Sequence, residues 1–141
     1  MITGLSHVSI AVPSLEAAAK RLKEVYGLSI GAVAVNEQQG VRLACVELPN
    51  ARIELMEPSR PDSPISKFLA QHPGGGIHHF CLNVDDVAAT ARAVTGKGAR
   101  VLGDGSPQQN VHGERIAFVH PKDFLGALVE LEEKGGTKNE R

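Results

Sequence analysis

The fold is decided by two stretches that share one pattern, His7-Val-Ser-Ile-Ala-Val12 and His79-Phe-Cys-Leu-Asn-Val84. Each is a histidine followed by strand-forming residues, and each leads through turn residues into an alanine-rich segment typical of a helix. Because the pattern recurs 72 residues later, it indicates an internal repeat of one structural unit. The alternative is chance resemblance between two short patterns, and the chemistry of the repeated side chains argues against it.

Each half of the chain predicts the order β-α-β-β-β. The first helix is expected over about 15–26, with Ser14 as N-cap and Gly27 just past its end. The second is expected over about 87–95, after Asp85 or Asp86 as cap. Further strands are expected over 31–36, 41–48 and 52–57 in the first half, and over 100–102, 114–120 and 127–132 in the second.

A single domain is expected over 1–135, because 141 residues suffice for one core but not for two independent ones. Its modules are 1–58 and 75–135, joined by a linker helix within 59–74 that Asp62 or Ser63 can cap and that has Pro64 in its first turn. The polar residues 136–141 are expected to be a frayed tail.

Composition excludes several classes of function. The net charge of −1 and the scattered Lys and Arg residues give no attraction to nucleic acid. The chain lacks an apolar stretch near the roughly 20 residues that span a bilayer, so no membrane partner is expected. The start MITGLSHVSIAV has no secretion-signal pattern, and two isolated cysteines fit a reducing compartment. We therefore expect a cytoplasmic protein.

The repeat also duplicates a carboxylate. Glu54 lies between Ile53 and Leu55, and Glu130 lies between Val129 and Leu131. Because strand side chains alternate between faces, each Glu points away from its apolar neighbours. A carboxylate buried in this way needs a partner. Each half therefore offers one histidine and one glutamate, which predicts a metal site made of His7, Glu54, His79 and Glu130.

Imidazole and carboxylate together suit a divalent Co, Zn, Mn or Ni ion, or iron, rather than Ca or Mg. Four protein ligands on an octahedral ion leave two positions open. A substrate that chelates through two oxygens could occupy them, with the ion acting as a Lewis acid.

From Leu5 to Glu132 the chain resembles the vicinal oxygen chelate superfamily, also called the glyoxalase/bleomycin resistance/dioxygenase superfamily. The likeness is greatest to the methylmalonyl-CoA epimerase family. Three segments carry it, Glu37–Arg42, Asp62–Leu69 leading to Gly75–His79, and His112–Lys122 leading to Gly126–Leu131.

The resemblance implies an α+β fold in which two tandem β-α-β-β-β modules form a curved mixed sheet around the metal. It implies a metal-dependent isomerase that interconverts (R)- and (S)-methylmalonyl-CoA through a stabilised enolate, and a homodimer. By alignment with His7, it makes His79 rather than His78 the ligand. It places a catalytic carboxylate at Glu130, whereas Glu54 is a weaker candidate for proton transfer.

Other polar residues could contact this small CoA thioester. His120 and Lys122 could meet its carboxylate or phosphates, although a turn-stabilising role is an equal alternative. His112 could line the mouth of the site.

Two departures from the family also matter, because some epimerases have Gln where this chain has Glu54, and some have a proton-transferring Glu where this chain has Leu43.

Three rival functions follow from the same superfamily. Lactoylglutathione lyase shares the ligand set, but the segments 62–69 and 112–122 disfavour it. An extradiol dioxygenase usually has two histidines and one carboxylate, so a fourth ligand at Glu54 disfavours that reaction. A non-catalytic ligand-binding protein would not need four intact ligand positions.

Overall fold

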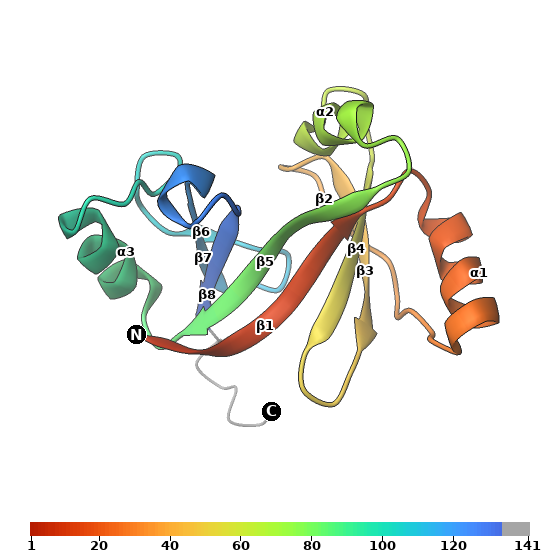
Figure 1. Ribbon diagram of the computed structural model, residues 1–141, viewed down its shortest axis with the longest axis horizontal. Coiled ribbons are helices and arrows are strands. Elements are labelled where there is room, and N and C mark those ends of the chain that lie inside the picture. The colour runs from red at the N-terminus through yellow and green to blue at the C-terminus, as the bar shows by residue number, and fades with distance from the viewer. Residues whose placement is uncertain (134–141) are drawn as a thin grey trace. The chain divides into compact units, whose positions relative to one another are not determined.

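The computed structural model describes residues 1–133, which form two compact units (Figure 1). His7–His78 make the N-terminal unit. Met1–Ser6 and the described part of His79–Arg141 make the C-terminal unit. The expected frayed tail, 136–141, lies outside the described residues.

The N-terminal unit contains the order β-α-β-β-β, followed by the linker helix. Its strands run in the order β2-β3-β4-β1, in which β1 and β4 are parallel and the other pairs antiparallel. The elements are β1 (Ile2–Ala11, shared with the C-terminal unit), α1 (Leu15–Tyr26), β2 (Ala34–Asn36), β3 (Val41–Glu47), β4 (Arg52–Pro58) and α2 (Pro64–Gln71).

The C-terminal unit repeats this order. Its strands follow β1 in the order β5-β8-β7-β6, with β5 and β8 parallel. The elements are β5 (Gly76–Val84, which begins in the N-terminal unit), α3 (Val87–Gly96), β6 (Gln108–Gln109), β7 (Arg115–Val119), the short 3-10 helix η1 (Pro121–Asp123) and β8 (Val129–Glu133). The α+β class, the mixed sheet and the repeated order are therefore confirmed.

The helices begin where the sequence predicts. Ser14 accepts a hydrogen bond from the Ala17 N–H at 3.1 Å and so caps α1, while Gly27 ends that helix at a φ of 70°. Asp86, not Asp85, caps α3 through the Ala89 N–H at 2.9 Å. Side chains of this kind satisfy backbone N–H groups that the first helical turn leaves unpaired.

A second contact at the helix starts is also repeated. The Leu15 N–H donates to Glu57 at 2.7 Å, and the Val87 N–H donates to Glu133 at 2.9 Å. In each unit a carboxylate at the end of the parallel strand therefore binds the N-terminus of the helix, where the helix dipole favours negative charge.

One predicted strand is wrong. Residues 100–102 contribute only an isolated bridge, between Val101 and Val119, and the short strand beside β7 is instead Gln108–Gln109. Two glycines with positive φ, Gly103 and Gly105, turn the chain away after that bridge. The strand expected over 31–36 is also shorter, since pairing with β3 begins at Ala34.

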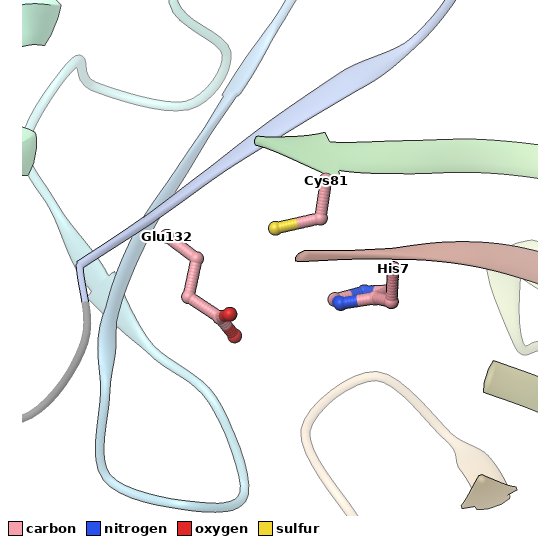
Figure 2. A group of neighbouring side chains, drawn as sticks. All are labelled: His7, Cys81 and Glu132. Atoms are coloured by element: carbon pink, nitrogen blue, oxygen red, sulfur yellow. The ribbon is translucent and has the colours of Figure 1, made fainter. Parts of the chain in front are cut away.

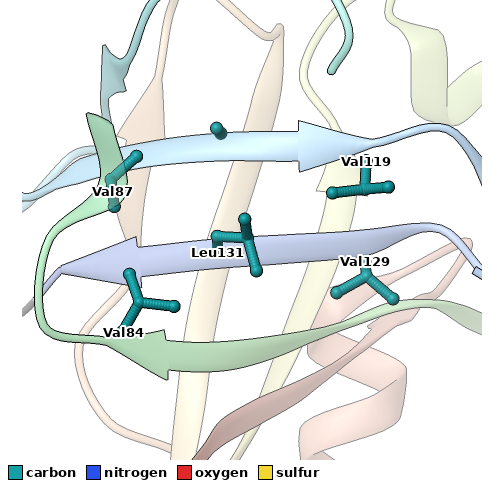
Figure 3. Packing of buried hydrophobic residues seen from close by; sticks show 6 residues of the cluster. Val84, Val87, Val119, Val129 and Leu131 are labelled. Atoms are coloured by element: carbon teal, nitrogen blue, oxygen red, sulfur yellow. The ribbon is translucent and has the colours of Figure 1, made fainter. Parts of the chain in front are cut away.

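Each unit has its own apolar cluster. In the C-terminal unit β5, β7 and β8 meet α3 in a cluster of Val84, Val87, Ala117, Val119, Val129 and Leu131 (Figure 3). In the N-terminal unit α2 covers β1, β3 and β4 in a cluster of Ala11, Val41, Leu43, Met56 and Ile65. Within residues 1–133 we find no helix long and apolar enough to cross a membrane.

Replacing Leu131 by Ala tests the C-terminal cluster. Leu131 is 3% exposed, so the Leu131→Ala substitution should lower the free energy of unfolding of the metal-free protein by about 2–5 kcal/mol. Urea unfolding measures the change. Leu125, which is 98% exposed, supplies the matched control, since Leu125→Ala should stay within about 0.5 kcal/mol of the parent. Equal effects of the two substitutions would contradict this account of the core.

Candidate active site

Each unit holds one buried histidine beside one glutamate. In the N-terminal unit His7 Nε2 lies 3.7 Å from Glu54 Oε1. In the C-terminal unit His79 Nε2 lies 3.0 Å from Glu130 Oε1. The two histidine side chains are 2% and 5% exposed, and those of the glutamates 15% and 7%. In each unit the structure therefore places the predicted histidine beside the predicted glutamate, and their role as metal ligands stays a prediction.

Strand register explains why the same pair forms twice. Ser9 of β1 is the partner of Glu54 in β4, and Cys81 of β5 is the partner of Glu130 in β8. Partners in parallel strands project from the same face, and so does the residue two positions earlier on the strand. That residue is the histidine in both units, so the parallel register places His and Glu side by side.

The surroundings of Glu54 include a hydrogen-bond donor on β1. The Ser9 hydroxyl, which is fully buried, donates to Glu54 Oε1 at 2.6 Å. Cys45 is the partner of Glu54 on the other side, in β3. Burial raises the pKa of the Cys45 thiol, and the negative charge of Glu54 raises it further. This thiol is therefore protonated at neutral pH and a poor nucleophile.

The surroundings of Glu130 differ. Its partner in β5 is a cysteine rather than a serine, and its partner in β7 is Phe118. The Phe118 ring meets the His79 ring edge-on at a centroid distance of 5.3 Å. In the C-terminal pair an aromatic ring thus contacts the histidine, whereas in the N-terminal pair a hydroxyl donates to the glutamate.

The distance between the ligand atoms within each His–Glu pair fits the binding of a divalent metal ion. Ligand atoms about 2.1 Å from a metal lie roughly 3 Å apart at a right angle and about 3.4 Å apart at the tetrahedral angle. The His79–Glu130 distance of 3.0 Å matches the first value, and the His7–Glu54 distance of 3.7 Å is slightly wider than the second. Each pair thus offers one imidazole nitrogen and one carboxylate oxygen at a spacing that suits two adjacent coordination positions.

His72 and His78 pack against Phe68. The His72 ring stacks on the Phe68 ring at 4.3 Å, and the His78 ring meets it edge-on at 5.2 Å. The two adjacent histidines of β5 therefore have different neighbours. His78 packs against Phe68, whereas His79 faces Glu130. The choice of His79 as the candidate ligand is consistent with that geometry.

The three candidate substrate contacts lie on turns of the C-terminal unit. His120 Nδ1 accepts a hydrogen bond from the Lys122 N–H at 3.0 Å, which is the turn-stabilising arrangement. Lys122 and His112 are exposed. The His112 N–H donates to the Asn110 side chain at 2.9 Å, within the turn between β6 and β7. A substrate-binding role for these residues stays a prediction.

The sequence analysis missed one buried carboxylate, Glu132. It is 2% exposed and lies on β8 two residues beyond Glu130, on the same face. One of its oxygens and the Cys81 sulfur lie within 4.8 Å of each other (Figure 2). The available signal was its spacing from Glu130, since residues i and i+2 of a strand share a face.

Leu43 belongs to the apolar cluster of the N-terminal unit. It is 6% exposed and is paired with Met56 in β4 and with Ala34 in β2. Glu47 lies at the other end of β3 and is paired with Arg52. The position where some epimerases have a glutamate is thus an apolar environment in this chain.

Comparison with known proteins gives one consistent family. The glyoxalase/bleomycin resistance protein/dioxygenase superfamily matches residues 6–118. The ethylmalonyl-CoA/methylmalonyl-CoA epimerase of Cereibacter sphaeroides is 47% identical over 94% of this chain and 99% of its own length.

Solved structures agree with that result. A variant of the Streptomyces coelicolor methylmalonyl-CoA epimerase in complex with 2-nitronate-propionyl-CoA superposes with a TM-score of 0.88. It is 37% identical and covers 96% of this chain and 97% of its own. A methylmalonyl-CoA epimerase in complex with methylmalonyl-CoA and NH4+ gives the same TM-score, identity and coverage.

Introducing the family's carboxylate at position 43 should destabilise this chain. We expect Leu43→Glu to lower the free energy of unfolding by at least about 2 kcal/mol at pH 7, because the charge is buried among apolar side chains. Burial would raise the pKa of the new carboxyl above its unfolded value, so the loss should shrink as the pH falls toward 5. Urea unfolding at both pH values measures this, and the neutral variant Leu43→Gln should show no such relief. A loss independent of pH would refute the burial argument.

Proposed function

Because the chain belongs to the glyoxalase/bleomycin resistance protein/dioxygenase superfamily, we propose that it is an epimerase that interconverts (R)- and (S)-methylmalonyl-CoA. The observation that carries this proposal is the 47% identity to the Cereibacter sphaeroides epimerase over 99% of that protein. The two His–Glu pairs support it, because they supply the ligands and the acid–base group that such a reaction needs.

The metal centre is proposed to consist of His7, Glu54, His79 and Glu130 around one divalent ion, Co, Zn, Mn or Ni. The donor chemistry and the spacing within each pair support this assignment. When bound, the metal supplies a positive charge that stabilises the enolate oxygen of the substrate. The four side chains would hold the ion and, through it, orient the substrate.

Glu130 is the proposed base. The C2 hydrogen of methylmalonyl-CoA is acidic because it lies between a thioester and a carboxylate, and a Glu130 oxygen would accept it. Glu54 is the weaker candidate because the family likeness places the catalytic carboxylate at Glu130, and the Oε1 of Glu54 accepts a hydrogen bond from the Ser9 hydroxyl at 2.6 Å. The proton must return to the opposite face of C2, for which Glu54 or a water molecule is the candidate donor.

Leu43 does not make the chain inactive in this proposal. The repeated His–Glu unit supplies a carboxylate from each half, so a third one at position 43 is not required. We therefore expect substantial epimerase activity without a glutamate there, and no gain in rate from Leu43→Glu.

Ethylmalonyl-CoA is a second candidate substrate, because the name of the Cereibacter sphaeroides relative includes it. It differs from methylmalonyl-CoA by one methylene group and undergoes the same chemistry at C2. His120, Lys122 and His112 are the proposed contacts to the substrate carboxylate or the CoA phosphates. A homodimer and a cytoplasmic location stay predictions from the sequence.

Isotope exchange tests the proposed reaction. Incubation of the metal-loaded protein with (R)-methylmalonyl-CoA in D2O should give the (S) form and deuterium at C2, detected by mass spectrometry and a chiral assay. Removal of the metal with a chelator should abolish exchange and lower the melting temperature, since an ion bound only to the folded state stabilises it. Faster turnover of the methylglyoxal–glutathione hemithioacetal would instead assign the chain as lactoylglutathione lyase.

Substitution of Glu130 separates proton transfer from metal binding. Glu130→Gln should retain part of the metal but lose C2 proton exchange by at least about 10²- to 10⁴-fold, because an amide can ligate weakly but cannot accept the proton. Glu54→Gln is the matched control and should lose much less activity. His79→Ala, measured by elemental analysis, should lose stoichiometric metal altogether. Near-normal exchange by Glu130→Gln would place the base elsewhere.

A further inference from the structure

Glu132 is a buried carboxylate that the proposed reaction does not use. Only 2% of it is exposed, and it projects from β8 on the same face as Glu130. Placing a carboxylate in such an environment is costly unless hydrogen bonds compensate for the lost water. Its contacts therefore indicate what the side chain holds in place.

Each carboxylate oxygen of Glu132 accepts a hydrogen bond from a segment distant in the sequence. The Ser6 hydroxyl donates to Oε1 at 2.8 Å, and the Asn110 amide donates to Oε2 at 3.0 Å. Ser6 is itself 6% exposed. A single side chain on β8 thus ties together the start of the chain and the turn between β6 and β7.

The Ser6 contact matters because His7 is the next residue in the chain. A hydrogen bond that fixes Ser6 also restricts the backbone from which the His7 imidazole projects. Groups that orient metal ligands without touching the metal typically change its affinity by about 10- to 100-fold when they are removed.

The Asn110 contact organises the turn rather than β1. Asn110 Oδ1 accepts hydrogen bonds from the N–H groups of His112 and Glu114. Its Nδ2 also donates to Glu114 Oε1 at 3.2 Å, in addition to Glu132. Glu114 and Glu132 therefore both accept from the Asn110 amide, whereas the hydrogen bond from the Ser6 hydroxyl goes to Glu132.

We propose that Glu132 is a positioning residue for the metal centre: by anchoring Ser6 to β8, it sets the backbone that presents His7 to the cation. This inference rests on the proposed metal centre and assigns Glu132 no direct contact with substrate or ion. A carboxylate suits the position because its two oxygens accept from the Ser6 hydroxyl and the Asn110 amide, whereas an apolar side chain such as leucine would accept from neither.

The test is metal affinity, measured with Co²⁺ alone by competition with a chromophoric chelator. Glu132→Leu and Ser6→Ala should each weaken Co²⁺ binding by about 10- to 100-fold. The double variant should bind Co²⁺ no more weakly than Glu132→Leu, because both substitutions remove the same link. Glu114→Leu is the matched control, since it alters the other carboxylate bound by Asn110, and its dissociation constant should stay within about twofold of the parent's.

Unfolding of the metal-free variants by urea distinguishes positioning from general stability. Ser6→Ala, the milder change, keeps the test informative where Glu132→Leu fails to fold. A variant that is folded and less stable but binds Co²⁺ with the parent's dissociation constant would overturn the positioning role. A parent protein that binds no Co²⁺ would instead remove the metal centre itself, and this inference with it.

Discussion

The parallel pairing of β1 with β4, and of β5 with β8, is the constraint on which the candidate site depends. The register pairs Glu54 with Ser9 in one unit and Glu130 with Cys81 in the other. Ser9 and Cys81 each lie two positions after the histidine of their unit. Since side chains two apart share a face, each histidine comes within 3.7 Å or less of its glutamate. A shift of one residue in either register would send the glutamate to the opposite face.

The two units share the same backbone arrangement but differ in some of the side chains around the His–Glu pair. Parallel strands, helix caps and the carboxylates that bind the helix N-termini recur in both. The residue facing the glutamate does not, since a serine hydroxyl clamps Glu54 and a thiol stands opposite Glu130. In the proposed reaction the two carboxylates also differ in role, since Glu130, which lies 3.0 Å from His79, is the proposed base and Glu54 the weaker candidate.

Much of the fold could be predicted from the sequence because its signals are local. The α1 helix follows from Ser14 and Gly27, whose capping contacts are made within three or four residues of the helix ends. The strand expected over 100–102 fails for a related reason. Its residues have strand propensity, but after a single bridge from Val101 to β7 the chain turns at Gly103 and Gly105, and the paired strand comes later, at Gln108 and Gln109. Propensity alone does not say which partner a short strand will find.

By itself the sequence determined the repeat, and with it the His and Glu of each half, because both residue types recur at nearly constant spacing. Only the tertiary structure decided what surrounds them. The contact of Glu132 with Ser6 joins residues 126 positions apart, and Leu43 is buried against Met56 through strand pairing. Such contacts depend on register and packing across the sheet, which no local pattern encodes, whereas caps and strand alternation arise from neighbours within a few residues.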